Sequence, residues 1–156
     1  MEFDRYRDAV AANRREHGFD AVDGGGSGFD LLWRTRDHDP SVGDVSVFAT
    51  VVNGSGYDAD DLVDTADRFR AVVARRTDDR ADSVTRIGYV VVAVPDPDPD
   101  LLSTATSYVV ADRRSNVFPI MYDLEEEAVH THAVPRLKGR GIYRRQATDA
   151  EQLFEA

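Results

Sequence analysis

The stretch that decides the fold is Ile87-Gly88-Tyr89-Val90-Val91-Val92-Ala93-Val94-Pro95, the only long unbroken apolar run in the chain. β-branched residues dominate it, and it is too short to span a membrane as a helix. An apolar run without polar alternation is typical of a strand that is covered on both faces. The sequence therefore predicts that residues 87–95 form the central strand of a sheet with other elements on both sides.

Two helices are expected to pack on this sheet. Residues 2–17 repeat apolar side chains at helical spacing, and Gly18 is a natural residue to end that helix. Residues 58–76 give the strongest helix pattern, because Asp58 can cap the first turn and basic residues follow at the end. The apolar stripe of this second helix consists of Leu62, Ala66, Phe69 and Val73.

The remaining segments favour strands. Residues 29–36 and 45–52 alternate and are expected to pair antiparallel across a short loop. Residues 101–105 suggest a helical turn, and residues 106–111 suit either a helix or, as we prefer, a strand. That strand would open a meander with residues 117–123 and 127–134, with Asp123 opposite Ala128. A capping box at residues 148–151 predicts the start of a short last helix.

These elements define the expected fold class. It is α+β, with a single mixed, mostly antiparallel sheet of five to six strands, packed by two helices and followed by a short C-terminal helix. The 156 residues show no internal repeat and no second apolar centre, so we expect residues 1–156 to form a single domain.

Composition restricts the classes of function. Cysteine is absent, which excludes disulfides, thiolate metal sites and cysteine nucleophiles. The 29 acidic residues exceed the 19 basic ones, the net charge is −10, and Lys138 is the only lysine. This balance resembles that of halophile proteins, whose acidic surfaces are screened at molar salt. Without a secretory signal or a membrane-spanning run, we expect a soluble protein in the cytoplasm of a halophile.

The leading candidate site is the segment from Arg136 to Arg145, which contains five bases and no acid. A concentrated positive segment on a strongly acidic chain suggests an anionic ligand or an acidic protein partner. Nucleic acid is a weaker possibility, because molar salt removes most of the gain from counterion release. The alternative is that these bases pair with carboxylates of the same chain. The candidate ligand-binding residues are Arg136, Lys138, Arg140, Tyr143, Arg144 and Arg145.

A rival hypothesis is a metal-dependent hydrolase. His130 and His132 would share one face of a strand, and Asp123 on the neighbouring strand could complete a set of three ligands. Such a site would leave positions on the ion for an activated water. Apart from this metal ion, the sequence predicts no cofactor. Asp96, Asp98 and Asp100 either bind a cation through oxygen ligands or form a stiff, solvated linker.

Other enzyme classes find little support in the sequence. There is no Gly-x-Ser-x-Gly motif for a nucleophilic serine. The order helix, two strands, helix, strand is similar to the core of restriction-endonuclease-like nucleases, which have an acid on one strand and Glu-x-Lys on the next. Asp30 matches the first position, but residues 45–50 contain neither Glu nor Lys. We therefore expect a non-enzymatic binding or regulatory module. A self-associating protein, with Trp33, Phe48 and Tyr143 exposed, is a third hypothesis.

Overall fold

The fold is a single open sheet with helices on both faces. A computed structural model describes residues 1–22, 28–29, 31–75, 84–112, 115–136 and 140–156. Within these ranges the sheet has seven strands, of which six follow the order β1-β2-β3-β4-β6-β5, and β7 pairs with β6 beside this path. The strands are β1 (Asp20–Val22), β2 (Leu32–Asp39), β3 (Gly43–Asn53), β4 (Thr85–Val94), β5 (Val110–Asp112), β6 (Ser115–Asp123) and β7 (Ala128–His130). The helices are α1 (Phe3–Glu16), α2 (Ala59–Arg75), α3 (Pro99–Ala105) and α4 (Arg140–Leu153).

The predicted central strand is confirmed. Every residue of β4 from Ile87 to Val94 is buried, and β4 lies between β3 and β6, parallel to both. The outer pairs are antiparallel, so the sheet is mixed as expected, with a parallel centre. Gly88 lets α2 approach closely, because a Cβ atom there would lie 3.0 Å from the ring of Phe69. Burial on both faces explains why this run lacks polar alternation.

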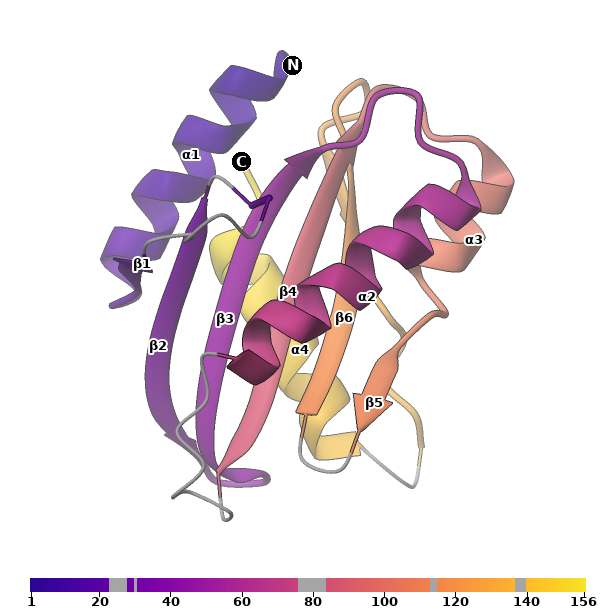
Figure 1. The fold of residues 1–156 in the computed structure, drawn as a ribbon. Coiled ribbons are helices and arrows are strands. Elements are labelled where there is room, and N and C mark those ends of the chain that lie inside the picture. Colours follow the sequence, from indigo (N-terminus) through magenta and orange to yellow (C-terminus); the bar gives the residue numbers. More distant parts are fainter. Residues whose placement is uncertain (23–27, 30, 76–83, 113–114, 137–139) are drawn as a thin grey trace.

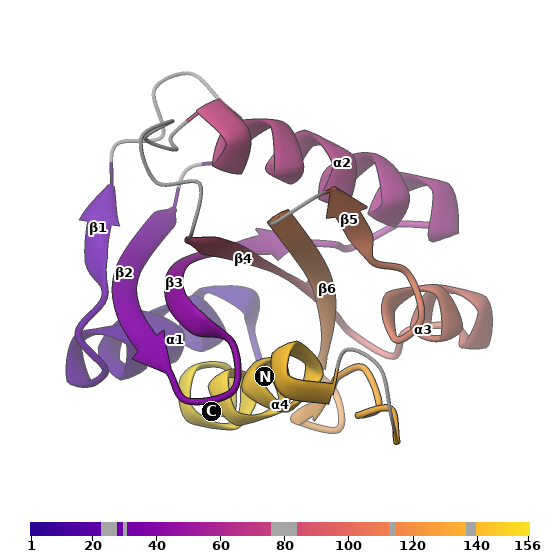
Figure 2. The same ribbon diagram turned by 90° about the horizontal axis from the view of Figure 1, so that it is seen from below.

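Two helices cover each face, and Figure 2 shows α2 on one side of the sheet with α1 and α4 on the other. The stripe predicted for α2 is buried, and the Asp58 carboxylate accepts a hydrogen bond from the Asp61 amide at 2.8 Å, as an N-cap does. On the opposite face, α1 buries Tyr6 and Val10. The helices predicted over residues 2–17 and 58–76 are therefore confirmed as α1 and α2.

The C-terminal helix differs from its prediction. It begins at Arg140 and not near Thr148, which lies in its third turn. The predicted capping box is therefore wrong. Residues 140–145 of the basic segment form the first turns of α4, which packs beside the β2–β3 hairpin (Figures 1 and 2).

The predicted meander is confirmed in register and shortened at both ends. Asp123 lies opposite Ala128, as expected. The strand expected over residues 106–111 forms only at Val110–Asp112, because residues 106–107 follow α3 as a turn. The last strand ends at His130, four residues earlier than predicted. The short edge strand β1 was not predicted at all.

The aromatic residues proposed for self-association are not exposed. Trp33 is 2% exposed and Phe48 is 1% exposed, while Tyr143 is half-buried. The expectation of an exposed aromatic surface is wrong, since these rings complete the two cores that flank the sheet. No helix among the described residues is long and apolar enough to cross a membrane.

Candidate functional site

The helix α4 separates the predicted basic segment into an outward and an inward side. Arg144 is exposed and forms no ion pair with any described residue. Arg145, the next residue, turns towards the sheet, and its side chain is only 12% exposed. Neighbouring helical positions differ by about 100° in direction, so adjacent arginines meet different surroundings. The inward arginine is the centre of the candidate site.

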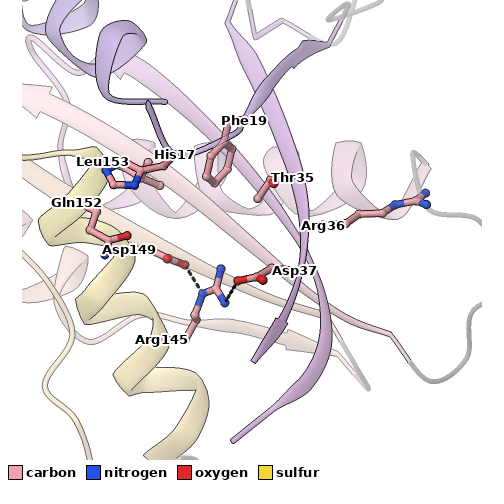
Figure 3. A pocket seen from close by; sticks show the side chains of 9 residues that line it. All are labelled: His17, Phe19, Thr35, Arg36, Asp37, Arg145, Asp149, Gln152 and Leu153. Atoms are coloured by element: carbon pink, nitrogen blue, oxygen red, sulfur yellow. Dashed lines mark hydrogen bonds and ion pairs between the residues drawn. The ribbon is translucent and has the colours of Figure 1, made fainter. Parts of the chain in front are cut away.

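Arg145 contacts three carboxylates in the groove between α4 and the β2–β3 hairpin, and Figure 3 shows its bonds to Asp37 and Asp149. Its Nε donates to Asp149 Oδ2 at 2.8 Å, within the same helix. Its Nη1 donates to Asp37 Oδ2 at 2.8 Å and lies 3.5 Å from Asp39 Oδ2. Asp149 Oδ2 also accepts a hydrogen bond from the hydroxyl of Tyr89 at 2.6 Å. The central strand, the hairpin and the last helix are thus joined by one polar network.

The network changes the ionisation of its members. A hydrogen bond from Arg145 lowers the pKa of Asp37 below its ordinary value. Burial raises the pKa of Asp149, and the hydrogen bonds from Tyr89 and Arg145 offset this only in part. Burial alone would lower the pKa of Arg145, but its bonds to Asp149 and Asp37 leave that pKa raised. Burial and the Asp149 charge raise the pKa of Tyr89, so its hydroxyl stays a donor.

Two cavities open on either side of this bridge. One, of about 230 Å³, extends towards the end of α1. The other, of about 370 Å³, extends towards the tip of the hairpin and includes Arg144. Four residues line both cavities and so form the wall between them: Asp37, Arg145, Asp149 and Gln152.

The hairpin tip is held close to the start of α4. Asp39 Oδ1 accepts hydrogen bonds from the amides of Ser41 and Val42, which fixes the turn. A Cβ atom on Gly141 would lie 3.0 Å from Ser41 Cβ, so glycine permits this close approach. Because Gly141 has no side chain, the tip of the β2–β3 hairpin can lie against the start of α4.

The other predicted ligand-binding residues are distributed around this groove. Arg136 is exposed, Lys138 lies outside the described residues, and Arg140 is described only as the first residue of α4. Tyr143 packs its ring edge-on against Phe118 with centroids 5.2 Å apart, so it belongs to the rim of the core. The structure places Arg144 and Arg145 together at the groove but gives them opposite environments.

The predicted metal ligands do not come together. His130 lies opposite Met121 in the β6–β7 pair, and Met121 belongs to the core on the α2 and α3 side. His132 lies beyond the end of β7 and packs edge-on against Phe118, which belongs to the core on the other side. The argument that positions i and i+2 share a face fails, because the strand ends between the two histidines.

Each of these side chains has another role. His132 is 3% exposed, and its Nε2 lies 2.8 Å from the carbonyl oxygen of Tyr108, a contact that requires a proton on Nε2. Burial lowers the pKa of His132, which favours its neutral form. Asp123 Oδ1 accepts hydrogen bonds from the amides of Glu125 and Glu126. Within the described ranges, no group of three or more His, Cys, Asp or Glu side chains could hold a metal ion.

The remaining sequence candidates are accounted for by local structure. Asp98 caps α3, because its Oδ1 accepts a hydrogen bond from the Leu101 amide at 2.8 Å. Asp30 lies outside the described residues. On β3, residues 45–50 contain neither Glu nor Lys, and Val45, Val47, Phe48 and Ala49 are buried in apolar cores. The resemblance to those nucleases is therefore limited to the order of elements.

Sequence reasoning missed Asp37, Asp39, Asp149 and Tyr89, which complete the network. In a chain with 29 acidic residues, a single aspartate carries almost no signal. A usable signal was the i, i+4 spacing of Arg145 and Asp149, which places both on one helix face once the start of α4 is known.

In comparisons with known proteins, no family model matches the chain, and no curated protein or solved structure matches it.

Proposed function

We propose that this protein is a non-enzymatic binding module that engages an anionic group of a ligand or protein partner through the outward basic surface at the start of α4. In this proposal Arg144 and Arg136 make the charged contacts. The proposed setting is the cytoplasm of a halophile, in line with the acidic, lysine-poor composition.

The observation that supports this proposal is the contrast between two neighbouring arginines. Arg145 is surrounded by three carboxylates, while Arg144 has no ion pair within the described residues. Arg5 and Arg15 of α1 are also exposed without an ion pair to a described residue, and Arg144 differs from them because it lines the cavity of about 370 Å³ beside the start of α4. Such a side chain is available to an external anion.

The helix itself adds to the positive potential. The first turn of α4 contains no acidic residue. Acids usually occupy this position, since the N-terminal end of a helix carries a partial positive charge from its free amides. Here Arg140 is the first residue of the helix and Arg144 follows one turn later, so the charge of the helix end and the charge of Arg144 have the same sign.

The geometry favours a small anionic group over nucleic acid. A base-stacking platform requires an exposed aromatic ring, and Tyr143 is engaged edge-on with Phe118 and lies 6.2 Å from the His132 ring. Without a free aromatic face, the contacts left to the surface are ionic. Carboxylate and phosphate groups are the ligands that such contacts recognise.

Isothermal titration with tripolyphosphate and with citrate, at several KCl concentrations, tests this function. We expect saturable binding that weakens about tenfold or more in the double variant R136E/R144E. The matched control is R5E/R15E, which makes the same change of charge on exposed arginines of α1. Equal binding by the two double variants, or no binding by the unmodified chain, would exclude this surface as an anion site.

A further inference from the structure

We propose that the start of β4 holds a binding site for a small tetrahedral oxyanion, such as a phosphate group, with Arg86 at its centre. The site lies on the face of the sheet that α2 covers, whereas α4 packs on the opposite face (Figure 2). It therefore differs in place from the outward surface of α4, and it does not depend on the function proposed for that surface.

Four polar side chains form a row across the central strands. The register places Arg36 of β2 opposite Ser46 of β3. On the next strands, Ser46 lies opposite Arg86, and Arg86 lies opposite Ser115 of β6. Residues opposite each other share one face of a sheet, and neighbouring strands lie about 4.8 Å apart. The row therefore brings two guanidinium groups and two hydroxyl groups together, and both kinds of group donate hydrogen bonds.

The row lies at the margin of the apolar core under α2. Two residues beyond Arg86 on β4, and so on the same face, Gly88 lies against Phe69 and Val73 of α2. On β6, Val117 belongs to the same core. Figure 1 shows the starts of β4 and β6 extending past α2. Arg86 is accordingly half-buried, so its guanidinium group is near the solvent without being surrounded by it.

Arg86 has a donor without an acceptor. Its Nε is buried and has no hydrogen-bond partner. Its Nη1 makes one long contact, of 3.5 Å, with Ser115 Oγ. No ion pair joins Arg86 to a described residue, although the chain contains 29 acidic residues. A buried N–H of a charged group without an acceptor is unfavourable, and a bound oxyanion would supply the acceptor.

The neighbours of Arg86 favour a tetrahedral oxyanion. Ser46 is 7% exposed and Ser115 is 8% exposed, and the Ser46 hydroxyl makes no hydrogen bond with a described residue. The Nε and one Nη of a guanidinium group present parallel N–H bonds that match two oxygens of a single phosphate. Hydroxyls on both sides add donors for further oxygens, which a carboxylate lacks. Arg36, which is exposed, adds positive charge at the outer end of the row.

The described groups of the protein do not supply the missing acceptor. Asp44 is on the same strand and face as Ser46, but its Oδ1 lies 2.9 Å from His38 Nδ1 and forms no ion pair with Arg86. The carbonyl end of α2 also attracts cations. Arg86 makes no hydrogen bond to a described carbonyl group, since its one bond is to Ser115. The acceptor is therefore left to a ligand.

The first test compares inorganic phosphate, sulfate and acetate as probes. Binding is measured by calorimetry at about 1 M KCl, where the Debye length is ~3 Å and exposed charges are screened. We expect saturable binding of phosphate and sulfate, at least about tenfold tighter than that of acetate. Acetate binding as tight as that of phosphate, or no saturable binding of phosphate, would overturn the proposal.

Variants locate the site. Arg86→Gln should lower phosphate affinity about tenfold or more, whereas Arg5→Gln, on an exposed arginine of α1, should leave it unchanged. Ser46→Ala should lower it about threefold to tenfold, and Ser55→Ala, on an exposed serine beyond β3, is the matched control. The fluorescence of the buried Trp33 shows whether each variant folds. Unchanged affinity in Arg86→Gln, or an equal loss in Arg5→Gln, would contradict the proposal.

Nitrogen-15 NMR of the arginine Nε–H groups separates this site from the surface of α4. The Arg86 signal is the one absent from Arg86→Gln, and we expect phosphate to shift it in the unmodified chain. The shift should persist in R136E/R144E. If phosphate leaves the Arg86 signal in place and its binding is lost in R136E/R144E, the ion binds at α4. That result would overturn this proposal and leave the proposed function intact.

Discussion

The helices α2 and α4 pack on opposite faces of one sheet and bury very different side chains. Among the buried residues of α2, Thr65 is the one polar side chain, and its hydroxyl bonds within the helix to the Asp61 carbonyl at 2.8 Å. The helix α4 buries the polar Gln146 and Asp149 together with the apolar Ala150 and Leu153. Apolar packing stabilises a fold without further partners, whereas each buried polar group needs a specific one. Apolar packing therefore holds α2, whereas α4 depends on a particular set of bonds in addition to its apolar packing.

The largest expected effect is that of Asp149→Ala. The change removes the acceptor of the Tyr89 hydroxyl and the closest helical partner of Arg145, both of which are buried or nearly so. Removing one member of a buried pair costs about 3–5 kcal/mol. Urea unfolding, followed by Trp33 fluorescence at constant KCl, measures the free energy.

The comparison between helices supplies the control for that variant. Thr65→Ala on α2 removes a hydroxyl whose shortest bond is to the Asp61 carbonyl of its own helix, with the Tyr57 hydroxyl at 3.3 Å, and we expect a cost of about 1 kcal/mol or less. If both variants lose the same free energy, the polar network does not hold α4 as argued.

A smaller effect is expected for Gln146→Leu, which nearly preserves volume. Gln146 Nε2 donates to the carbonyls of His132 and Tyr143 at 2.8 and 3.1 Å, and its Oε1 accepts from the His132 amide at 3.4 Å. Leucine removes these bonds from the His132 amide and carbonyl, at a cost of about 1–3 kcal/mol. Hydrogen exchange at the His132 amide is the direct measurement. Full protection of that amide in the variant would contradict the assigned role.

The same comparison explains which parts of the fold the sequence predicts. On α2 the buried positions are apolar at regular spacing, so the helix is visible in the sequence from start to end. On α4 the buried positions 146 and 149 are polar and interrupt the apolar stripe. The apolar pattern therefore does not predict the first two turns of this helix. The long-range partners of Arg145 are invisible for another reason. Asp37 is 108 positions away, and only the folded sheet brings it near.

The histidine prediction shows a further limit. The register of the β6–β7 pair is predicted correctly, because the turn after Asp123 determines it. Where β7 ends is not predicted, since residues 131–134 keep an alternating pattern beyond the last strand pair. Packing of the His132 ring against Phe118 takes the chain across to the other core. Local pattern cannot indicate such a crossing.

Asp37→Asn tests the exposed end of the network through pH. The pKa of Asp37 in the folded state is lowered, chiefly by the hydrogen bond from Arg145. Its contribution to stability is therefore present above the unfolded pKa of about 3.9 and is lost as pH falls through the lower folded value. Because this side chain is 54% exposed, we expect a difference below about 1 kcal/mol.

The measurement is the pH dependence of urea unfolding for the unmodified chain and the variant. The difference between them should shrink as pH falls below the ordinary aspartate range. Asp20→Asn removes an exposed carboxylate that forms no ion pair with a described residue, and it should show no such dependence. A difference that grows on acidification would reverse the sign argued here.

The smallest effect concerns the α2 side, where Tyr108 bonds to the surface of the helix. Its hydroxyl donates to Asp67 Oδ1 at 2.7 Å, and this bond, with smaller contributions from burial and the Asp67 charge, raises the pKa of Tyr108 to about 12. Because the folded value lies above the ordinary 10.0, the stabilisation is complete below that pH and is lost as pH rises through about 12. Tyr108→Phe should cost about 0.5 kcal/mol at neutral pH, since the bond is solvent-exposed. Subtracting the alkaline phenolate absorbance of the variant from that of the unmodified chain should isolate one group with a midpoint near 12. A midpoint near 10 would show that Tyr108 does not donate this bond to Asp67. The helix α2 would then lack even this polar contact, and its difference from α4 would be larger.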